Sequence, residues 1–508
     1  MDLGALARRL LHFEHPGESF PANFSPDQGI NRIMTTRRNF LKMGISAGAL
    51  AASRCMWART ASRIGAASSA AVWEEVPRIL ARIKPPKFPS REFDIRKYGG
   101  KGDNETDNTE AFRAAIAACS KAGGGRVVIP HGEFITGAIE LKGNVNLHVS
   151  EGATLRFTRD TSKYPLVFTR WEGTECMNYS PFIYAFEQEN LAITGKGTID
   201  GNADQQHWWN WRSTRAPGSS SGGDQPSDRQ KLVEMATQGV PPRERVFGPG
   251  HYLRPQFIQP YRSKNILIEG LRLLNSPMWQ VTPCLCANVT VRDLHIDASG
   301  PNTDGCDPES CSDVLIENCF FNTGDDCIAI KSGRNDDGRR VNIPSQNIVI
   351  QGCHMKNGHG GVTIGSEISG GVHNVYARNC QMDSPILYMA LRIKNNAARG
   401  GLIEKIYLRD VTIGQVAQAP IGIDYYYEEG EKGGYKPTVR GVAVDNLKSE
   451  KSKYGVYLRG FKNDPIEDIS LANCDFNGVT DGNVVENVEN ISLRKVRING
   501  TEVQRLTS

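Results

Sequence analysis

Nine segments between residues 265 and 498 repeat one pattern of apolar and polar positions. Each begins with a polar or small residue, alternates apolar and polar positions, reaches a turn-like residue, and resumes with an apolar one. Because this alternation has the two-residue period of a strand, it predicts several short β-strands in every repeat. The first apolar residues of the nine segments are Ile266, Val289, Val314, Ile348, Val375, Ile406, Val442, Ile469 and Ile491.

The repeats predict an all-β fold, a right-handed, single-stranded parallel β-helix. Residues 144–157 and 190–201 look like earlier members of the same series. In such a solenoid each coil lies on the previous one at the strand spacing of about 4.8 Å, so residues of equal phase become neighbours. A β-propeller, the competing architecture, would have more even repeats and hairpin turns.

One helix is predicted before the first strands, over residues 107–125. Its apolar positions recur at helical spacing, Asp107 or Asn108 can cap its first turn, and glycines end it. We expect this helix to cap the N-terminal end of the solenoid, where strand edges would otherwise be exposed.

The N-terminal 90 residues predict export rather than a folded domain. Arg37 and Arg38 precede a stretch of small and apolar residues, which resembles a twin-arginine export signal rather than the start of an amphipathic helix. We interpret the 33 residues before Met34 as an over-extended gene start. Residues 1–90, including the linker 84–90, are therefore expected to lie outside the fold, and the protein to work in the periplasm or outside the cell.

The remaining residues, 91–508, are expected to form the β-helix. A long polar insertion over residues 201–250 interrupts the coils and contains several tryptophans. Long loops are often functional, and aromatic faces can stack on sugars as well as fill a core.

Charge and hydropathy exclude two classes of partner. The net charge is +4, but residues 1–90 carry a surplus of seven positive charges, so the rest of the chain is slightly acidic. This distribution argues against a nucleic-acid-binding protein. No apolar run reaches the length of a membrane-spanning helix, so we expect no membrane partner.

The cysteines of the repeats predict buried thiols rather than a disulfide framework. Four of them occupy the same position of the repeat, which favours a stack inside the solenoid. These four are Cys319, Cys353, Cys380 and Cys474. Disulfides between Cys306 and Cys311, or between Cys284 and Cys286, are left open by the sequence.

Four polar motifs follow the strands of four consecutive repeats. They are NTDG with Asn302 and Asp304, GDD with Asp325 and Asp326, GHGG with His359, and RIK with Arg392 and Lys394. Counting from the first apolar residue of each segment puts Asp325 and His359 at equal phase on neighbouring coils. We therefore expect three acids, one histidine and two cations to share one face of the solenoid.

Each motif alone also has a purely structural interpretation. The NTDG residues can form an Asx-type turn, Asp325 and Asp326 can bind calcium, and His359 can be a turn histidine. Arg392 and Lys394 can simply neutralise nearby acids. The four motifs together, at stacked phases, favour acid–base chemistry, because repulsion among three acids raises the pKa of one and keeps it protonated.

Taken in this order and spacing, the four motifs resemble glycoside hydrolase family 28, the polygalacturonases and their relatives. The resemblance extends from about Phe93 to Arg497 and implies a pectin-lyase-like solenoid that hydrolyses α-1,4-galacturonosidic linkages with inversion. It implies Asp325 as general acid, Asp304 and Asp326 as holders of the attacking water, and His359 as the residue that orients the acid. Asn302, Arg392, Lys394 and Tyr427 would bind an acidic pectic polysaccharide or oligosaccharide, and no cofactor is expected.

Other functions remain open at this point. Within the same family, the substrate could be rhamnogalacturonan or xylogalacturonan. Parallel β-helices also serve as calcium-dependent pectate lyases and as non-catalytic glycan-binding scaffolds, although neither needs His359 in this position. We expect the insertion over residues 201–250 to wall off one end of the groove, which favours exo-acting cleavage. The sequence does not indicate an oligomeric state.

Overall fold

The computed structural model describes residues 69–212 and 224–507. The twin-arginine segment, Met34 and Cys55 lie outside the described residues. None of the helices in the described part of the chain has the length and hydropathy of a membrane span.

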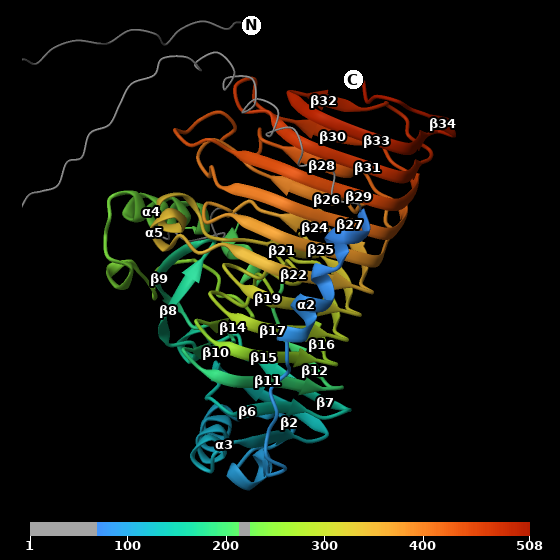
Figure 1. Cartoon of the computed structure of the whole chain (residues 1–508). Coiled ribbons are helices and arrows are strands. Elements are labelled where there is room, and N and C mark those ends of the chain that lie inside the picture. Colours follow the sequence, from blue (N-terminus) through green and yellow to red (C-terminus); the bar gives the residue numbers. More distant parts are fainter. Residues whose placement is uncertain (1–68, 213–223, 508) are drawn as a thin grey trace, which may run out of the picture. The chain divides into compact units, whose positions relative to one another are not determined.

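The described residues form the predicted right-handed parallel β-helix, whose coils are built from three stacked series of parallel strands (Figure 1). The first series pairs neighbour to neighbour from the first coil to the last. Its strands are β1 (Glu92–Asp94), β3 (Gly125–Ile129), β6 (Val145–Val149), β11 (Glu189–Gly195), β15 (Lys264–Glu269), β17 (Ala287–Arg292), β19 (Ser312–Glu317), β22 (Ser345–Gln351), β25 (Val372–Met382), β27 (Leu402–Gln415), β29 (Thr438–Lys451), β31 (Ile466–Phe476) and β33 (Val488–Ile498).

The second series follows each strand of the first after a sharp corner. It merges with the first series from β25 onward, where one long strand spans both. Its separate strands are β2 (Asp103–Asp107), β4 (Gly132–Thr136), β7 (Ala153–Phe157), β12 (Thr198–Asp200), β16 (Arg272–Leu274), β18 (His295–Ala298), β20 (Phe320–Thr323) and β23 (His354–Asn357).

The third series carries the candidate active site. The strands are β5 (Ile139–Glu140), β10 (Ile183–Phe186), β14 (Ile258–Tyr261), β21 (Ile328–Ile330), β24 (Gly360–Ile364), β26 (Met389–Lys394), β28 (Ala419–Asp424), β30 (Val456–Arg459) and β32 (Val484–Glu486). Between β14 and β21, two coils contribute only isolated β-bridges to this series, at residues 281–284 and 306–309.

Asparagines at the start of the repeats explain how the chain turns from coil to coil. Asn190, Asn265 and Asn288 all have a φ between 55° and 59°, a left-handed conformation that asparagine adopts more readily than most residues. The Nδ2 of Asn288 donates to Oδ1 of Asn265 at 2.8 Å, and Asn265 donates in the same way to Asn190 at 3.1 Å. The same residue type therefore fixes the corner and links successive coils.

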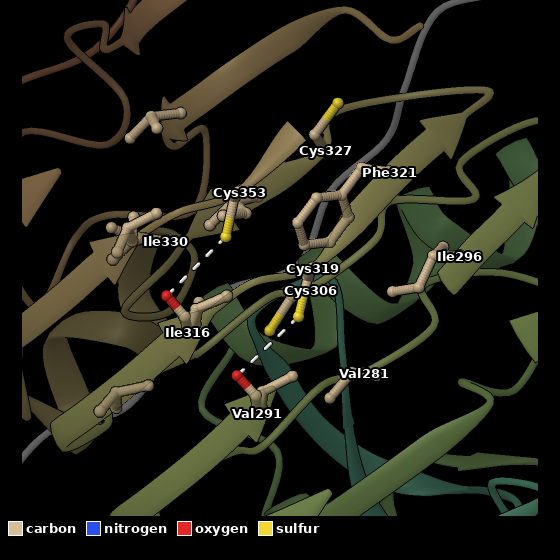
Figure 2. Close-up of a cluster of buried hydrophobic side chains, with 14 of the residues drawn as sticks. Val281, Val291, Ile296, Cys306, Ile316, Cys319, Phe321, Cys327, Ile330 and Cys353 are labelled. Atoms are coloured by element: carbon tan, nitrogen blue, oxygen red, sulfur yellow. Dashed lines mark hydrogen bonds between the residues drawn. The ribbon is translucent and has the colours of Figure 1, made fainter. Parts of the chain in front are cut away.

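Three of the four predicted cysteines stack inside the solenoid, whereas Cys474 lies in the same column beyond Val411 and Leu447. His354 pairs with Phe320 and Gln381, so Cys353, one residue earlier, lies between Cys319 and Cys380. Figure 2 shows the thiols of Cys319 and Cys353 among apolar side chains, each directed toward a backbone carbonyl of an adjacent strand. The eleven described cysteines are all free and buried, so the disulfides left open between residues 306 and 311 and between 284 and 286 do not form.

The predicted cap is helix α3 (Thr109–Lys121), which lies at the first coil (Figure 1). Asn108 is its N-cap residue but makes no capping hydrogen bond with its side chain, whereas the carboxylate of Asp107 accepts a hydrogen bond from the backbone N–H of Thr109 at 2.9 Å. Phe112 and Ile116 point into the solenoid and join its core. The helix therefore supplies the hydrophobic cover that a first coil lacks.

The prediction that residues before 91 lie outside the fold is wrong for residues 69–90. They form α1 (Ser69–Trp73) and α2 (Glu75–Arg82), and α2 lies across β19 and β22 (Figure 1). Val76 and Ile79 are fully buried and form a small separate core with Val349 of the coils. The spacing of these apolar residues is helical, and it matches an apolar patch on the outside of the first strand series.

Four insertions surround the third strand series on one side, and we call them the wall. One is the antiparallel hairpin of β8 (Leu166–Trp171) and β9 (Thr174–Tyr179), and a second is α5 (Asn335–Val341). A third, residues 201–250, contains η3 (Trp209–Arg212), α4 (Gln225–Thr237), η4 (Pro242–Glu244) and β13 (Val246–Phe247). The fourth is the loop over residues 425–437. The remaining elements are η1 (Ile95–Tyr98), η2 (Thr161–Lys163) and β34 (Thr501–Glu502).

Candidate active site

The four sequence motifs converge on the third strand series. GDD and His359 lie just before β21 and β24, and Arg392 and Lys394 lie within β26. The backbone N–H of Gly305 donates to the carbonyl of Asp326, and that of His359 donates to the carbonyl of Asp325. NTDG, GDD and GHGG therefore lie on three consecutive coils. Gly360 leaves room for this arrangement, because a Cβ at this position would clash with Oγ1 of Thr363 and lie 3.0 Å from Oδ1 of Asp326.

Three carboxylates meet at this point. Asp304, Asp325 and Asp326 each place an oxygen within 4.8 Å of the others. Asp326 is fully buried and Asp304 is 3% exposed, whereas 16% of the Asp325 side chain is open to the surface. Asp325 is therefore the member of the cluster that a substrate can reach directly.

The predicted cations pair with the deepest of the three acids. Nζ of Lys394 lies 2.7 Å from Oδ2 of Asp326, and a guanidinium nitrogen of Arg392 lies 3.5 Å from Oδ1. The Arg392 guanidinium also lies 5.2 Å from the ring of Tyr388 and 5.5 Å from the ring of Tyr427. Two aromatic rings therefore hold Arg392 at the surface of the site.

His359 pairs with the exposed acid. Its Nδ1 lies 2.8 Å from Oδ1 of Asp325, while Nδ2 of Asn302 lies 3.3 Å from Oδ2. Burial alone would raise the pKa of Asp325, but the hydrogen bond and charge of His359, together with Lys394 and Lys331, lower it overall. The same hydrogen bond raises the pKa of His359. The shared proton therefore rests on His359, next to the carboxylate.

The acid whose pKa is raised is Asp304. Burial is the main cause, followed by the negative charges of Asp307 and Asp325. In the free protein, the acid of the cluster that is expected to stay protonated is thus Asp304. Asp325 is instead ionised and receives a proton from His359 when it needs one.

Sequence reasoning missed three charged residues beneath the cluster. Asp307 is fully buried, and neither of its carboxylate oxygens has a hydrogen-bond partner among the described residues, so burial raises its pKa. Nζ of Lys331 lies 3.3 Å from Glu367 and 3.6 Å from Asp304. In the segment GDDCIAIKSG, Lys331 directly follows the apolar strand β21, and a lysine in that place is the signal that could have identified it.

The wall is held over this cluster by ion pairs among its parts. Arg229 of α4 lies 2.6 Å from Glu172, at the tip of the β8–β9 hairpin, and 3.1 Å from Glu428 of the loop 425–437. Arg334, just before α5, lies 3.5 Å from Glu172 and 3.2 Å from Glu428, and Arg399 lies 2.5 Å from Glu428. Three guanidinium groups thus join separate insertions into one barrier.

A cavity of about 720 Å³ lies between the wall and the carboxylate cluster. The wall side is formed largely by the first two turns of α4 and by Arg212. The floor is formed by Asn302, Asp325, His359, Arg392 and Tyr427. Five of the sequence-predicted site residues therefore face this pocket, and Asp304 and Lys394 line a smaller adjoining cavity. Asp326 is fully buried behind Lys394 and Arg392.

Comparison with known proteins identifies the family. The model of glycosyl hydrolases family 28 matches residues 250–497. The solved structure of a hyperthermoactive exopolygalacturonase from Thermotoga maritima is 43% identical, covers 86% of this chain and 98% of its own, and has a TM-score of 0.81. The chain belongs to glycosyl hydrolases family 28.

Two further relatives of this family 28 glycoside hydrolase are more distant. A probable polygalacturonase of Vitis vinifera is 29% identical over 397 residues, which are 74% of this chain and 72% of the relative. An exo-poly-alpha-D-galacturonosidase of Dickeya chrysanthemi is 27% identical over 363 residues, 66% of this chain and 57% of the relative. The predicted family and fold class are thus confirmed.

The three carboxylates of this family 28 enzyme could in principle bind a divalent cation, but nearby lysines already neutralise two of them. Among the described residues, only Asp304, Asp325 and Asp326 form a group with metal-ligand spacing. Lys331 and Lys394 lie against two of the three. A cation would have to compete with both ammonium groups, so the arrangement suits acid–base chemistry better than metal binding.

The proton shared by His359 and Asp325 predicts a pH dependence for the family 28 enzyme. Because the pKa of His359 is raised above its usual 6.5, kcat should decline on the alkaline side at a pH above 6.5, where the pair loses its proton. In the variant His359→Gln, this decline should move to lower pH, because Asp325 must then hold the proton alone. Rates on an oligogalacturonide between pH 4 and 9 check this.

The contribution of His359 to the free energy of unfolding also falls as pH rises. A histidine with a raised folded pKa stabilises fully below its unfolded pKa and loses that contribution as pH rises through the folded pKa. The free energy of unfolding should therefore also decline as pH rises through the folded pKa of His359, and an unchanged kcat profile in His359→Gln would contradict the shared proton.

Proposed function

We propose that this family 28 enzyme hydrolyses α-1,4-galacturonosidic linkages in pectin-derived polygalacturonate and oligogalacturonides, with inversion, from a chain end. The observation that carries the proposal is the pairing of an accessible Asp325–His359 couple with two buried acids inside a walled pocket. The identity of the polygalacturonase relatives supports the substrate class.

In this mechanism Asp325 protonates the leaving glycosidic oxygen. His359 supplies the proton through the 2.8 Å contact, so the carboxyl is re-protonated after each turnover. Asp304 and Asp326 hold the water that attacks the anomeric carbon, and the carboxylate of Asp326 accepts the proton that this water loses. Proton transfer to the leaving group and activation of water on the opposite side are the two tasks of an inverting glycosidase.

Burial supports inversion over a covalent intermediate. Carboxyl groups of inverting enzymes usually lie about 6.5 to 9.5 Å apart, and the oxygens here lie closer, within 4.8 Å. However, a nucleophilic carboxylate must touch the sugar, and Asp304 and Asp326 are almost completely buried. A water molecule above them can reach the anomeric carbon when their own oxygens cannot.

Arg392 and Lys394 suit a substrate with carboxylates. Arg392 lines the pocket between two tyrosine rings, and its planar guanidinium can bind a uronate group beside the cleaved bond. Lys394 lies beneath it, 5.2 Å from the ring of Tyr427, and adds a second positive charge. Two cations share the single carboxylate of Asp326, so a uronate carboxylate would add a second acidic partner that a neutral sugar does not offer.

The wall supports attack at a chain end. A groove open at both ends admits a polymer anywhere along its length, whereas the barrier joined by Arg229 and Arg334 stops it. The exopolygalacturonase from Thermotoga maritima, which matches over 98% of its length, is consistent with this mode. We also propose that Arg37 and Arg38 direct export to the periplasm or the medium.

We expect mono- or digalacturonide to be released from polygalacturonate, with reducing ends appearing long before the viscosity falls. Viscosity, reducing ends and product sizes, measured on one reaction, check this. A rapid loss of viscosity at a few per cent hydrolysis would show that the groove is open. Replacement of residues 212–242 by a short Gly-Ser linker should shift cleavage toward internal bonds, because it removes Arg229 and α4.

The same reaction separates hydrolysis from the other candidates. Activity should persist in a chelator, and the products should lack the absorbing unsaturated bond that a lyase creates. NMR of the first product should show inverted anomeric configuration. Parallel assays on rhamnogalacturonan and xylogalacturonan test the alternative substrates within the family, and rates above that on galacturonan would overturn the proposed specificity.

A further inference from the structure

Arg254 is a completely buried arginine, and none of the described carboxylates forms an ion pair with it. All its hydrogen-bond partners are neutral oxygens. Nε donates to Oε1 of Gln225 at 2.7 Å, one terminal nitrogen donates to the carbonyls of Pro277 and Pro301 at 2.9 and 2.8 Å, and the other donates to Oδ1 of Asn302 at 2.8 Å. Burying an unpaired charge is costly, so this position needs a reason.

These contacts determine which way the amide of Asn302 faces. A guanidinium has only donors, so Asn302 must present its carbonyl oxygen to Arg254. The amide nitrogen then faces the opposite way, toward Oδ2 of Asp325 at 3.3 Å. The two hydrogen bonds place the short side chain of Asn302 between Arg254 and Asp325.

The consequence falls on the proposed general acid. His359 holds Oδ1 of Asp325 and Asn302 holds Oδ2, so both oxygens meet donors and the carboxyl has one orientation. If the Asn302 amide turned over, its oxygen would face Oδ2. It would repel the carboxylate, or accept the proton intended for the substrate.

Arg254 also connects this pair to the wall. Gln225 is the first residue of α4 and lines the substrate pocket together with Asn302 and Asp325. One buried guanidinium therefore contacts the wall helix, the loops before Met278 and Asn302, and the NTDG motif itself.

We propose that Arg254 is a positioning residue that fixes the amide of Asn302 with its donor toward Asp325 and ties this orientation to helix α4. The proposal rests on the proposed role of Asp325 as general acid. Arg254 lies between the insertion and β14, outside all four motifs, so this segment would also take part in proton transfer.

A double-mutant cycle tests it. Arg254→Met and Asn302→Ala should each lower kcat on trigalacturonide about tenfold or more. The double variant should be no slower than the slower single variant, because both remove the same orientation. In Arg254→Met the alkaline limb of the kcat profile should also shift relative to the wild type, since the amide can now accept from a protonated Asp325. A multiplied loss in the double variant, or an unchanged pH profile, would overturn the proposal.

Arg245→Met is the matched control. Arg245 is also buried in the wall, but it contacts Asp337 and the carbonyls of Val240 and Glu175, away from the cluster. Its effect on kcat should multiply with that of Asn302→Ala. If Arg254→Met does not fold, Arg254→Lys serves instead, because one ammonium cannot reach all four acceptors. The wild-type protein is assayed first. If it is inactive on every galacturonide, the proposed function itself is wrong, and this outcome is distinguished from failure of the Arg254 proposal.

Discussion

The variant Asp325→Asn is expected to retain its fold and to lose about 10²- to 10⁴-fold in kcat on oligogalacturonides, the usual contribution of a general acid. Asparagine has the same shape and can still accept from Nδ1 of His359 at the 2.8 Å position. It cannot deliver a proton to the glycosidic oxygen. Initial rates on trigalacturonide measure the loss, and the urea midpoint shows that the fold is intact.

A matched substitution separates this loss from a general effect of removing a carboxylate. Asp475→Asn changes an aspartate that pairs with Arg497 at 3.6 Å on the first strand series, far along the chain from the four motifs. It should keep wild-type kcat. Turnover of Asp325→Asn within a few-fold of wild type would remove Asp325 from the acid role.

The largest loss of stability is expected from Lys331→Met, about 3 to 5 kcal/mol at neutral pH, the usual cost of breaking a buried ion pair on one side. The ammonium is 3% exposed, and it lies between Glu367 and Asp304, which are 6% and 4% exposed as side chains. Burial would lower the pKa of Lys331, but the charges of Glu367, Asp304, Asp307 and Asp326 raise it overall. Urea unfolding at pH 7.5 measures the loss.

The loss in Lys331→Met should shrink as pH falls. Without the ammonium, the buried acids have raised folded pKa values, so protonation at low pH removes their uncompensated charge. Lys453→Met, which breaks a pair with Asp481 that is about half exposed on both sides, should cost less than about 1 kcal/mol at either pH. Equal losses for the two lysines would contradict the structural role of Lys331.

The repeat pattern was enough to predict the fold and the convergence of the motifs. Strand register in a solenoid follows directly from the phase of the apolar positions, so Asp325 and His359 could be placed on neighbouring coils by counting. Asp304 lies further from its anchor, and its place depends on the loop after β18. The pattern alone does not give that loop, although the order of the motifs indicates it.

The features that were missed depend on contacts between insertions. Arg229, Arg334 and Glu172 meet only because loops of unrelated length fold toward each other, and no period relates them. The docking of α2 was missed because it is a short amphipathic stretch between the twin-arginine segment and the linker 84–90, and neither neighbour predicts a packed helix. Arg254 lies outside every motif, and only the direction of its hydrogen bonds reveals its connection with Asn302.

The free thiols inside the coils determine where this protein can acquire its structure. Among the described residues the cysteines are all reduced and buried, and the column of Cys319, Cys353 and Cys380 contributes packing, with no covalent bond to be made. Folding of this part of the chain therefore requires neither an oxidant nor a disulfide isomerase, and a reducing cytoplasm is as suitable a folding compartment as any other. Export of an already folded protein would require that property, and purification in millimolar reductant should leave the enzyme fully active.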